Sequence, residues 1–106
     1  MRWYVAHGYE VLARNWRCSA GEIDLLCART ERGDGRVARV LVVCEVKART
    51  TALHGHALEA VTPAKRRRLR RLAAAFLHSQ DGRFDHVRFD VVAVAGPWLE
   101  VVESAS

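Results

Sequence analysis

Two acidic residues and a lysine, carried by two short segments, have the types and spacing of a site that handles phosphate. The segments are Gly21–Asp24 and Glu45–Lys47, and each has the composition of one end of a β-strand. Between them, Asp34-Gly35 is the preferred dipeptide for a tight hairpin turn. With that pair as the turn, the hairpin register puts Asp24 directly opposite Glu45.

Opposed carboxylates on one face of a sheet repel each other and destabilise it, which a chain normally avoids. A divalent cation between Asp24 and Glu45 removes the repulsion, so the pair predicts a Mg²⁺ or Mn²⁺ site completed by the main-chain carbonyl of Val46 and by water. Glu22 is a candidate for a further or outer ligand. It would also lie opposite Lys47, so the alternative is a surface ladder of ion pairs with no metal.

Lys47 follows Glu45 by two residues and therefore lies on the same face of the strand. A cation at that place can orient an attacking water or help to deprotonate it, and can stabilise the negative charge that develops on a phosphate. The predicted catalytic set is Asp24, Glu45 and Lys47.

The elements that would position these residues follow from apolar periodicity and from turn residues. Residues 2–7 predict the last turn of a helix ending at Gly8, and strands are expected at 9–16, 21–29, 37–48, 87–94 and 99–102. A helix from Pro63 to His78 is predicted by the N-cap Thr62 and by a stripe of Leu69, Leu72, Ala73, Phe76 and Leu77. A hairpin followed by a crossover helix and another strand indicates a single α/β domain with a mixed sheet.

Composition narrows the class of protein. The chain has 106 residues, half of them hydrophobic, which is enough for one globular domain, and no apolar run is long enough to cross a bilayer. We therefore expect a cytoplasmic protein with no membrane partner, in which Cys18, Cys27 and Cys44 are reduced. Motifs for nucleotide hydrolysis, dinucleotide binding, serine hydrolase chemistry and zinc proteolysis are absent from the sequence.

Six cations crowd the first half of the predicted helix, in the segment Lys65–Arg71. Positive charge near a helix N-terminus opposes the helix dipole, at roughly 0.3–1 kcal/mol per exposed charge. Phosphate groups on this surface would compensate for that cost, and the net charge of +5 favours a polyanionic partner. The predicted nucleic-acid contacts are Arg49, Lys65, Arg66, Arg67 and Arg70, and the alternative is a solvated face of an amphipathic helix.

Several segments, in this order, closely resemble the YraN-like proteins, uncharacterised protein family 0102. They are Gly8–Cys18, Gly21–Asp24, Glu45–Lys47, the run from Glu59 through Lys65, and Arg88–Val92. The resemblance covers residues 8–103. It implies a restriction-endonuclease-like fold, similar also to Holliday-junction resolvases, in which the D…E-x-K signature of such nucleases falls on Asp24, Glu45 and Lys47.

The resemblance also implies a longer first helix that carries a Gly-Glu pair, whose acid would be a further active-site carboxylate. This chain starts at what would be the end of that helix, so the helix is expected to be truncated here. Two interpretations stay open: the start lies further upstream, or the site has one acid fewer and is weak or inactive.

These observations predict a metal-dependent endonuclease that binds structured nucleic acid, with DNA the expected partner, and hydrolyses phosphodiesters. The alternative is a nucleic-acid-binding module of the same fold without turnover. A protein-interaction subunit that uses the basic helix on an acidic partner is the third class. Whether a homodimer positions two sites is left open.

Overall fold

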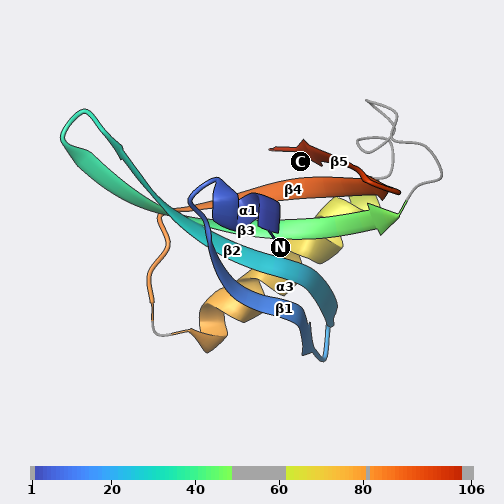
Figure 1. Cartoon of the computed structure of the whole chain (residues 1–106). Helices are drawn as coiled ribbons and strands as arrows, with labels where there is room; N and C mark the ends of the chain where they lie inside the picture. Colours follow the sequence, from blue (N-terminus) through green and yellow to red (C-terminus); the bar gives the residue numbers. More distant parts are fainter. Residues whose placement is uncertain (1, 49–61, 81, 104–106) are drawn as a thin grey trace.

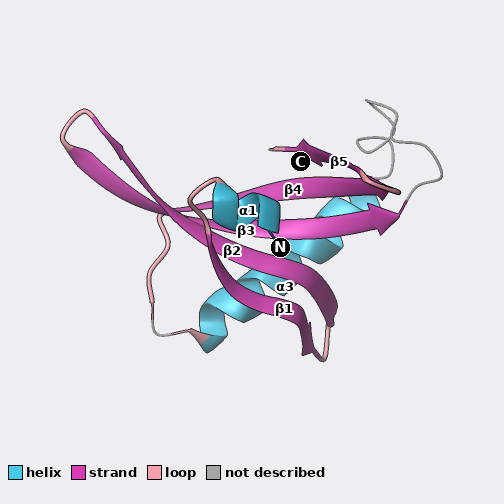
Figure 2. Cartoon of the chain, in the orientation of Figure 1, coloured by secondary structure: helices cyan, strands magenta, loops and turns pink. Residues whose placement is uncertain are grey.

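Five strands form one mixed sheet in the computed structural model, which describes residues 2–48, 62–80 and 82–103 (Figures 1 and 2). The strands are β1 (Glu10–Cys18), β2 (Gly21–Gly33), β3 (Arg36–Ala48), β4 (His86–Ala95) and β5 (Trp98–Val102), and they lie in sequence order across the sheet. The pair β3 and β4 is parallel, and the other three neighbouring pairs are antiparallel. The prediction of an α/β fold with a mixed sheet is confirmed.

Two helices lie on opposite faces of this sheet, α1 (Arg2–Ala6) and α3 (Pro63–Ser79) (Figure 1). The parallel pair needs a crossover connection, and α3 lies within it. Its start is as predicted, because the Thr62 hydroxyl accepts a hydrogen bond from the Lys65 amide at 3.2 Å and Pro63 occupies the first turn. In this described part of the chain, no helix has the length and apolar character needed to cross a membrane.

The α3 face of the sheet holds one half of the core. Leu69, Leu72 and Phe76 of the predicted apolar stripe are buried, and they pack on a layer from β2 and β3 made of Ile23, Leu26, Leu41 and Val43. Trp16 adds an edge-to-face contact with Phe76, with ring centroids 5.3 Å apart. This packing fixes α3 across β2 and β3 and so determines which of its cations face the sheet.

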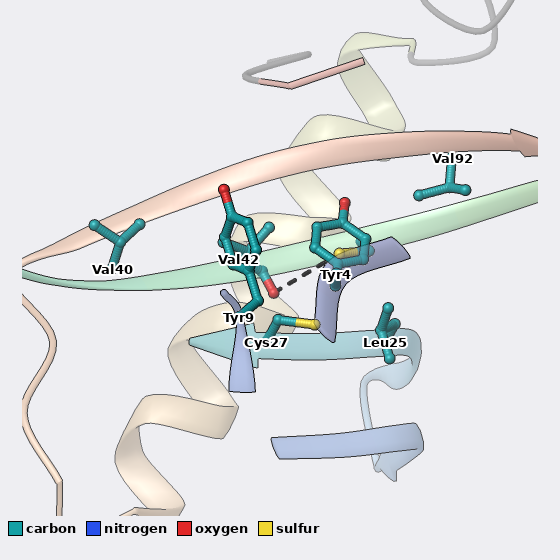
Figure 3. Close-up of a cluster of buried hydrophobic side chains, with 8 residues drawn as sticks. Tyr4, Tyr9, Leu25, Cys27, Val40, Val42 and Val92 are labelled. Carbon is teal, nitrogen blue, oxygen red and sulfur yellow. Dashed lines mark hydrogen bonds between the residues drawn. The ribbon is translucent and has the colours of Figure 1, made fainter. Parts of the chain in front are cut away.

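The α1 face holds the other half of the core, in which Tyr4 and Tyr9 cover Leu25, Cys27 and other strand residues (Figure 3). All three cysteines are free, as predicted, and Cys27 and Cys44 are buried within strands.

A buried polar cluster ties α1 to β4 on this face. The Tyr4 hydroxyl donates to Asp90 Oδ2 at 2.8 Å, and Arg88 donates to both oxygens of the same carboxylate at 2.9 Å. Arg88 also donates to the Tyr9 hydroxyl at 2.8 Å. The carboxylate of Asp90 therefore has charge-assisted partners that compensate for its burial.

The hairpin of β2 and β3 turns at Asp34-Gly35, as predicted, with φ values of 49° and 71°. Two positive φ values are typical of a type I′ turn, which matches the twist of the strands that it joins. The predicted register is confirmed from Gly33 opposite Arg36 to Leu25 opposite Cys44. Both strands extend closer to the turn than expected, since residues 30–33 and 36 also belong to the ladder.

Candidate active site

Glu45 of β3 lies at the centre of a group of three cations. Its Oε1 atom is 3.1 Å from the Lys47 ammonium, 3.8 Å from that of Lys65 and 3.7 Å from the Arg68 guanidinium. The side chain of Glu45 is 8% exposed, and its Oε2 atom is buried without a hydrogen-bond partner in the structure as described. One oxygen of this carboxylate is thus surrounded by positive charge, while the other has an unused acceptor capacity.

Asp24 lies beside the same segment of β3, although not as a regular ladder partner. Its Oδ2 atom accepts a hydrogen bond from the main-chain amide of Val46 at 2.8 Å. The carboxylate therefore takes the place of a main-chain acceptor next to Glu45. Its other oxygen makes none of the hydrogen bonds found among the described residues.

The extrapolated register is wrong beyond Leu25 and Cys44, where the β2–β3 ladder ends. The start of β2 instead pairs with β1, with Ile23 opposite Trp16. Asn15, in the partner strand, has a φ of 49°, a local irregularity of the kind that redirects a strand. Asp24 is consequently free to turn its carboxylate toward Val46.

Glu22 does not join this group. Its carboxylate is 3.3 Å from Arg17 of β1, and both side chains are substantially exposed. The alternative pairing of Glu22 with Lys47 is therefore wrong, since Lys47 pairs with Glu45 on its own strand. Among the described residues no group of three or more His, Cys, Asp or Glu side chains is placed to hold a metal.

The two lysines of this group shift each other's pKa. The contact of Lys47 with Lys65, followed by the nearby charges of Glu45 and Asp24, raises the pKa of Lys47 above its usual value. The same contact with Lys47 lowers the pKa of Lys65. Lys47 is therefore a fixed cation rather than a base at neutral pH.

The predicted basic residues of α3 divide between two surfaces. Lys65 faces Glu45, Arg66 is half-buried, and Arg67 and Arg70 are exposed. Arg49 lies outside the described residues.

Arg68 contacts Glu45 and was not among the predicted site residues. A signal for it exists in the helical spacing, because Arg68 and Lys65 precede Leu72 and Leu69 by four residues each. They therefore extend the buried apolar stripe toward the helix N-terminus and must face the sheet.

Taken together, the fold and the site define a small α/β protein with an acidic pair and a basic cluster at one end of a mixed sheet. The chain belongs to the uncharacterised protein family UPF0102, whose family model matches residues 1–94.

Its relatives include UPF0102 proteins of three organisms. The Mycolicibacterium gilvum protein is 54% identical over 87 residues, which are 82% of this chain and 66% of that protein. The Beutenbergia cavernae protein is 48% identical over 93 residues, covering 88% of this chain and 72% of the relative. The Leifsonia xyli protein is 40% identical over 96 residues, covering 91% and 75%. The chain thus spans about two thirds to three quarters of the length of these relatives.

Proposed function

We propose that this protein is a metal-dependent nuclease that hydrolyses phosphodiester bonds in structured nucleic acid, with DNA as the expected substrate. The observation that carries the proposal is the convergence of Asp24, Glu45 and Lys47 at one end of the β2–β3 hairpin. This is the arrangement of residue types expected for a D…E-x-K site. The restriction-endonuclease-like fold is part of the same proposal, supported by a mixed sheet with a crossover helix.

The residues present fit a Mg²⁺ or Mn²⁺ ion. The buried Oε2 atom of Glu45 lacks a hydrogen-bond partner, and Asp24 keeps one oxygen that the Val46 amide does not use. Together with the main-chain carbonyl of Val46, these atoms would form an oxygen-only donor set, which Mg²⁺ prefers. When bound, such an ion polarises the scissile phosphate and lowers the pKa of a coordinated water.

The chain's own residues supply the electrostatics of the reaction. Lys47 stays protonated and can stabilise the negative charge that develops on the phosphate. Lys65 and Arg68 lie 3.7–3.8 Å from Glu45, longer than a strong charge-assisted hydrogen bond, so both can exchange this contact for a phosphate oxygen. The exposed Arg67 and Arg70 of α3 would hold the backbone of the substrate.

A binding module without turnover is the second candidate. Two observations favour it: three cations already surround Glu45, and the described residues offer two carboxylates at this place rather than three. In that case the cluster would bind phosphate without activating water.

Asp24→Asn is the variant that separates these candidates. The amide oxygen of Asn can still accept the hydrogen bond from Val46, so the fold should persist, while the charge that holds the cation is lost. We expect cleavage of branched or flapped DNA to disappear and binding to remain. The assay uses excess enzyme with Mg²⁺ or Mn²⁺, and an RNA substrate is tested beside the DNA.

Asp85→Asn provides the matched control, because the Asp85 carboxylate likewise accepts a hydrogen bond from a main-chain amide, that of Arg39 at 2.7 Å, and belongs neither to the Glu45 site nor to the tip of the hairpin. It should cleave like the parent. Tight binding without any cleavage by the parent would establish the binding module instead. Cleavage that persists in Asp24→Asn would exclude this site as the catalytic one.

A further inference from the structure

The β2–β3 hairpin continues beyond the rest of the sheet as a two-stranded ribbon, residues 30–39. Figure 1 shows it projecting past β1, β4 and both helices. Residues 30–37 are all exposed, so neither face of the outer ribbon is covered, yet its ladder is complete from Thr30 opposite Arg39 to Gly33 opposite Arg36. The ribbon is therefore ordered by pairing and by its turn rather than by a core.

Positive charge at the end of this ribbon lacks compensation. The side chains of Arg32 and Arg36 form none of the ion pairs or side-chain hydrogen bonds found in the described parts of the chain. Arg29 and Arg39, at the base, have partners in Glu31 at 4.0 Å and Glu10 at 3.4 Å. Asp34 is the acid of the turn, and it likewise forms none of these ion pairs.

We propose that the ribbon is a second nucleic-acid contact, which enters a groove of a duplex whose backbone lies at the candidate active site. This inference rests on the proposed function, because it assumes that the site near Glu45 meets the same duplex. Two strands about 4.8 Å apart fit within a major groove about 12 Å wide, and Arg at a ribbon tip can reach phosphates on either side.

The length of β3 matches the repeat of a duplex. Arg36 and Glu45 are nine residues apart on one strand, or about 30 Å at the usual rise of roughly 3.3 Å per residue. One turn of B-form DNA is about 34 Å long. By strand alternation, Val37 shares a face with Glu45, and Arg32 is the cross-strand partner of Val37. A duplex lying along this face would thus meet both ends of the hairpin about one turn apart.

The ribbon is a poor surface for an apolar partner. Val37, 58% exposed, is its one large exposed apolar side chain, whereas its two tip arginines suit a polyanion. Charge complementarity therefore favours nucleic acid over a second copy of this chain, which is itself positively charged.

The test compares duplexes of two lengths. Duplexes of about 8 base pairs are shorter than one turn and cannot reach both sites, whereas duplexes of about 24 base pairs span two turns. For the double variant Arg32→Gln with Arg36→Gln, we expect the slope of log affinity against log salt to flatten by about one on the longer duplex, since Arg32 shares the face of Glu45 whereas Arg36 lies on the opposite face, and to stay unchanged on the shorter one.

Two further variants separate the outcomes. The control variant Arg2→Gln with Arg14→Gln also removes two positive charges, but from the α1 face. Arg2 lies on α1, and Arg14 is the strand partner of Leu25, which belongs to the core on that face. This control should leave both slopes unchanged. Arg67→Gln with Arg70→Gln, on α3, should weaken binding of both duplexes.

If the α3 variant weakens binding but the ribbon variant matches the parent on the longer duplex, the inference is overturned and the proposed function stands. If neither variant changes binding, the inference is overturned together with the proposed role of Arg67 and Arg70 as backbone contacts, and cleavage by the parent and by Asp24→Asn decides whether the proposed function stands. A change of oligomeric state in the ribbon variant, measured by light scattering, with duplex binding unchanged, would assign the ribbon to a second copy and also overturn the inference.

Discussion

Glu45 is a buried carboxylate whose loss of hydration is offset by nearby positive charge. A carboxylate at 8% exposure loses most of its hydration, and here three cations replace it. The shortest contact, at 3.1 Å, comes from Lys47 of the same strand, while the two from α3 are longer. We infer that Lys47 is the permanent partner of Glu45 and that Lys65 and Arg68 can be recruited by a ligand.

Substitutions of Lys47 test whether its side chain acts as a fixed positive charge or as a base. Because its pKa is raised, Lys47 holds its proton at neutral pH, so we expect its contribution to be electrostatic. Lys47→Met should reduce metal-dependent cleavage by about 10²-fold or more, whereas Lys47→Arg, which keeps the charge, should retain a substantial part of it. Single-turnover cleavage rates measure both. Equal loss in the two variants would indicate that the amine itself transfers a proton.

At the scale of elements, local chemistry determined what was predictable. Asp34-Gly35 set the turn and therefore the register over nine pairs, and Thr62-Pro63 set the start of α3. The same extrapolation failed where the ladder ends, since the course of β2 near Asp24 depends on its pairing with β1. The lysine and arginine that face Glu45 follow from helix packing rather than from the density of charge along α3.

The site itself was only partly predictable for the same reason. The Asp24, Glu45 and Lys47 side chains could be grouped from spacing and resemblance, although their roles remain predictions. The hydrogen bond from Val46 to Asp24 has no signal in the sequence, because it exists only where the ladder is interrupted. The true partner of Glu22 was missed because Arg17 reaches it from β1, across the other side of β2.

The ribbon should be dispensable for folding. Deleting residues 31–32 and 37–38 shortens both strands by two residues. The pair Thr30 and Arg39 then lies next to the pair Gly33 and Arg36 of the intact turn, and every remaining side chain keeps its face of the sheet. These residues lie outside the core, and we expect the free energy of unfolding to change by less than about 1 kcal/mol. Urea unfolding measures this. A loss of cooperative folding would show that the ribbon supports the sheet.

At the scale of the whole molecule, a buried polar cluster and the candidate site lie on opposite faces of one sheet. The α1 face carries the buried cluster of Tyr4, Asp90 and Arg88, which joins residues 86 positions apart in the chain. The α3 face carries Glu45 and the cations around it. Stability and phosphate binding should therefore respond to different substitutions.

Tyr4→Phe tests this separation from the stability side. It removes the hydroxyl that donates to Asp90, but Arg88 still donates to that carboxylate, so we expect the free energy of unfolding to fall by about 1 kcal/mol. The salt dependence of duplex binding should not change. Val5→Ala, at a position 58% exposed on the same helix, is the control and should be nearly neutral.

The reverse experiment uses Arg67→Gln with Arg70→Gln on α3. Both side chains are exposed in the first half of the helix, where positive charge opposes the helix dipole, so their neutralisation should leave stability equal or slightly higher. The salt slope of duplex binding should flatten by about one unit for each phosphate that the variant no longer neutralises. Urea unfolding and a salt titration, run on the same preparations, give both quantities. A flattened slope in Tyr4→Phe, or a marked loss of stability in the α3 variant, would show that the two faces are coupled through the sheet.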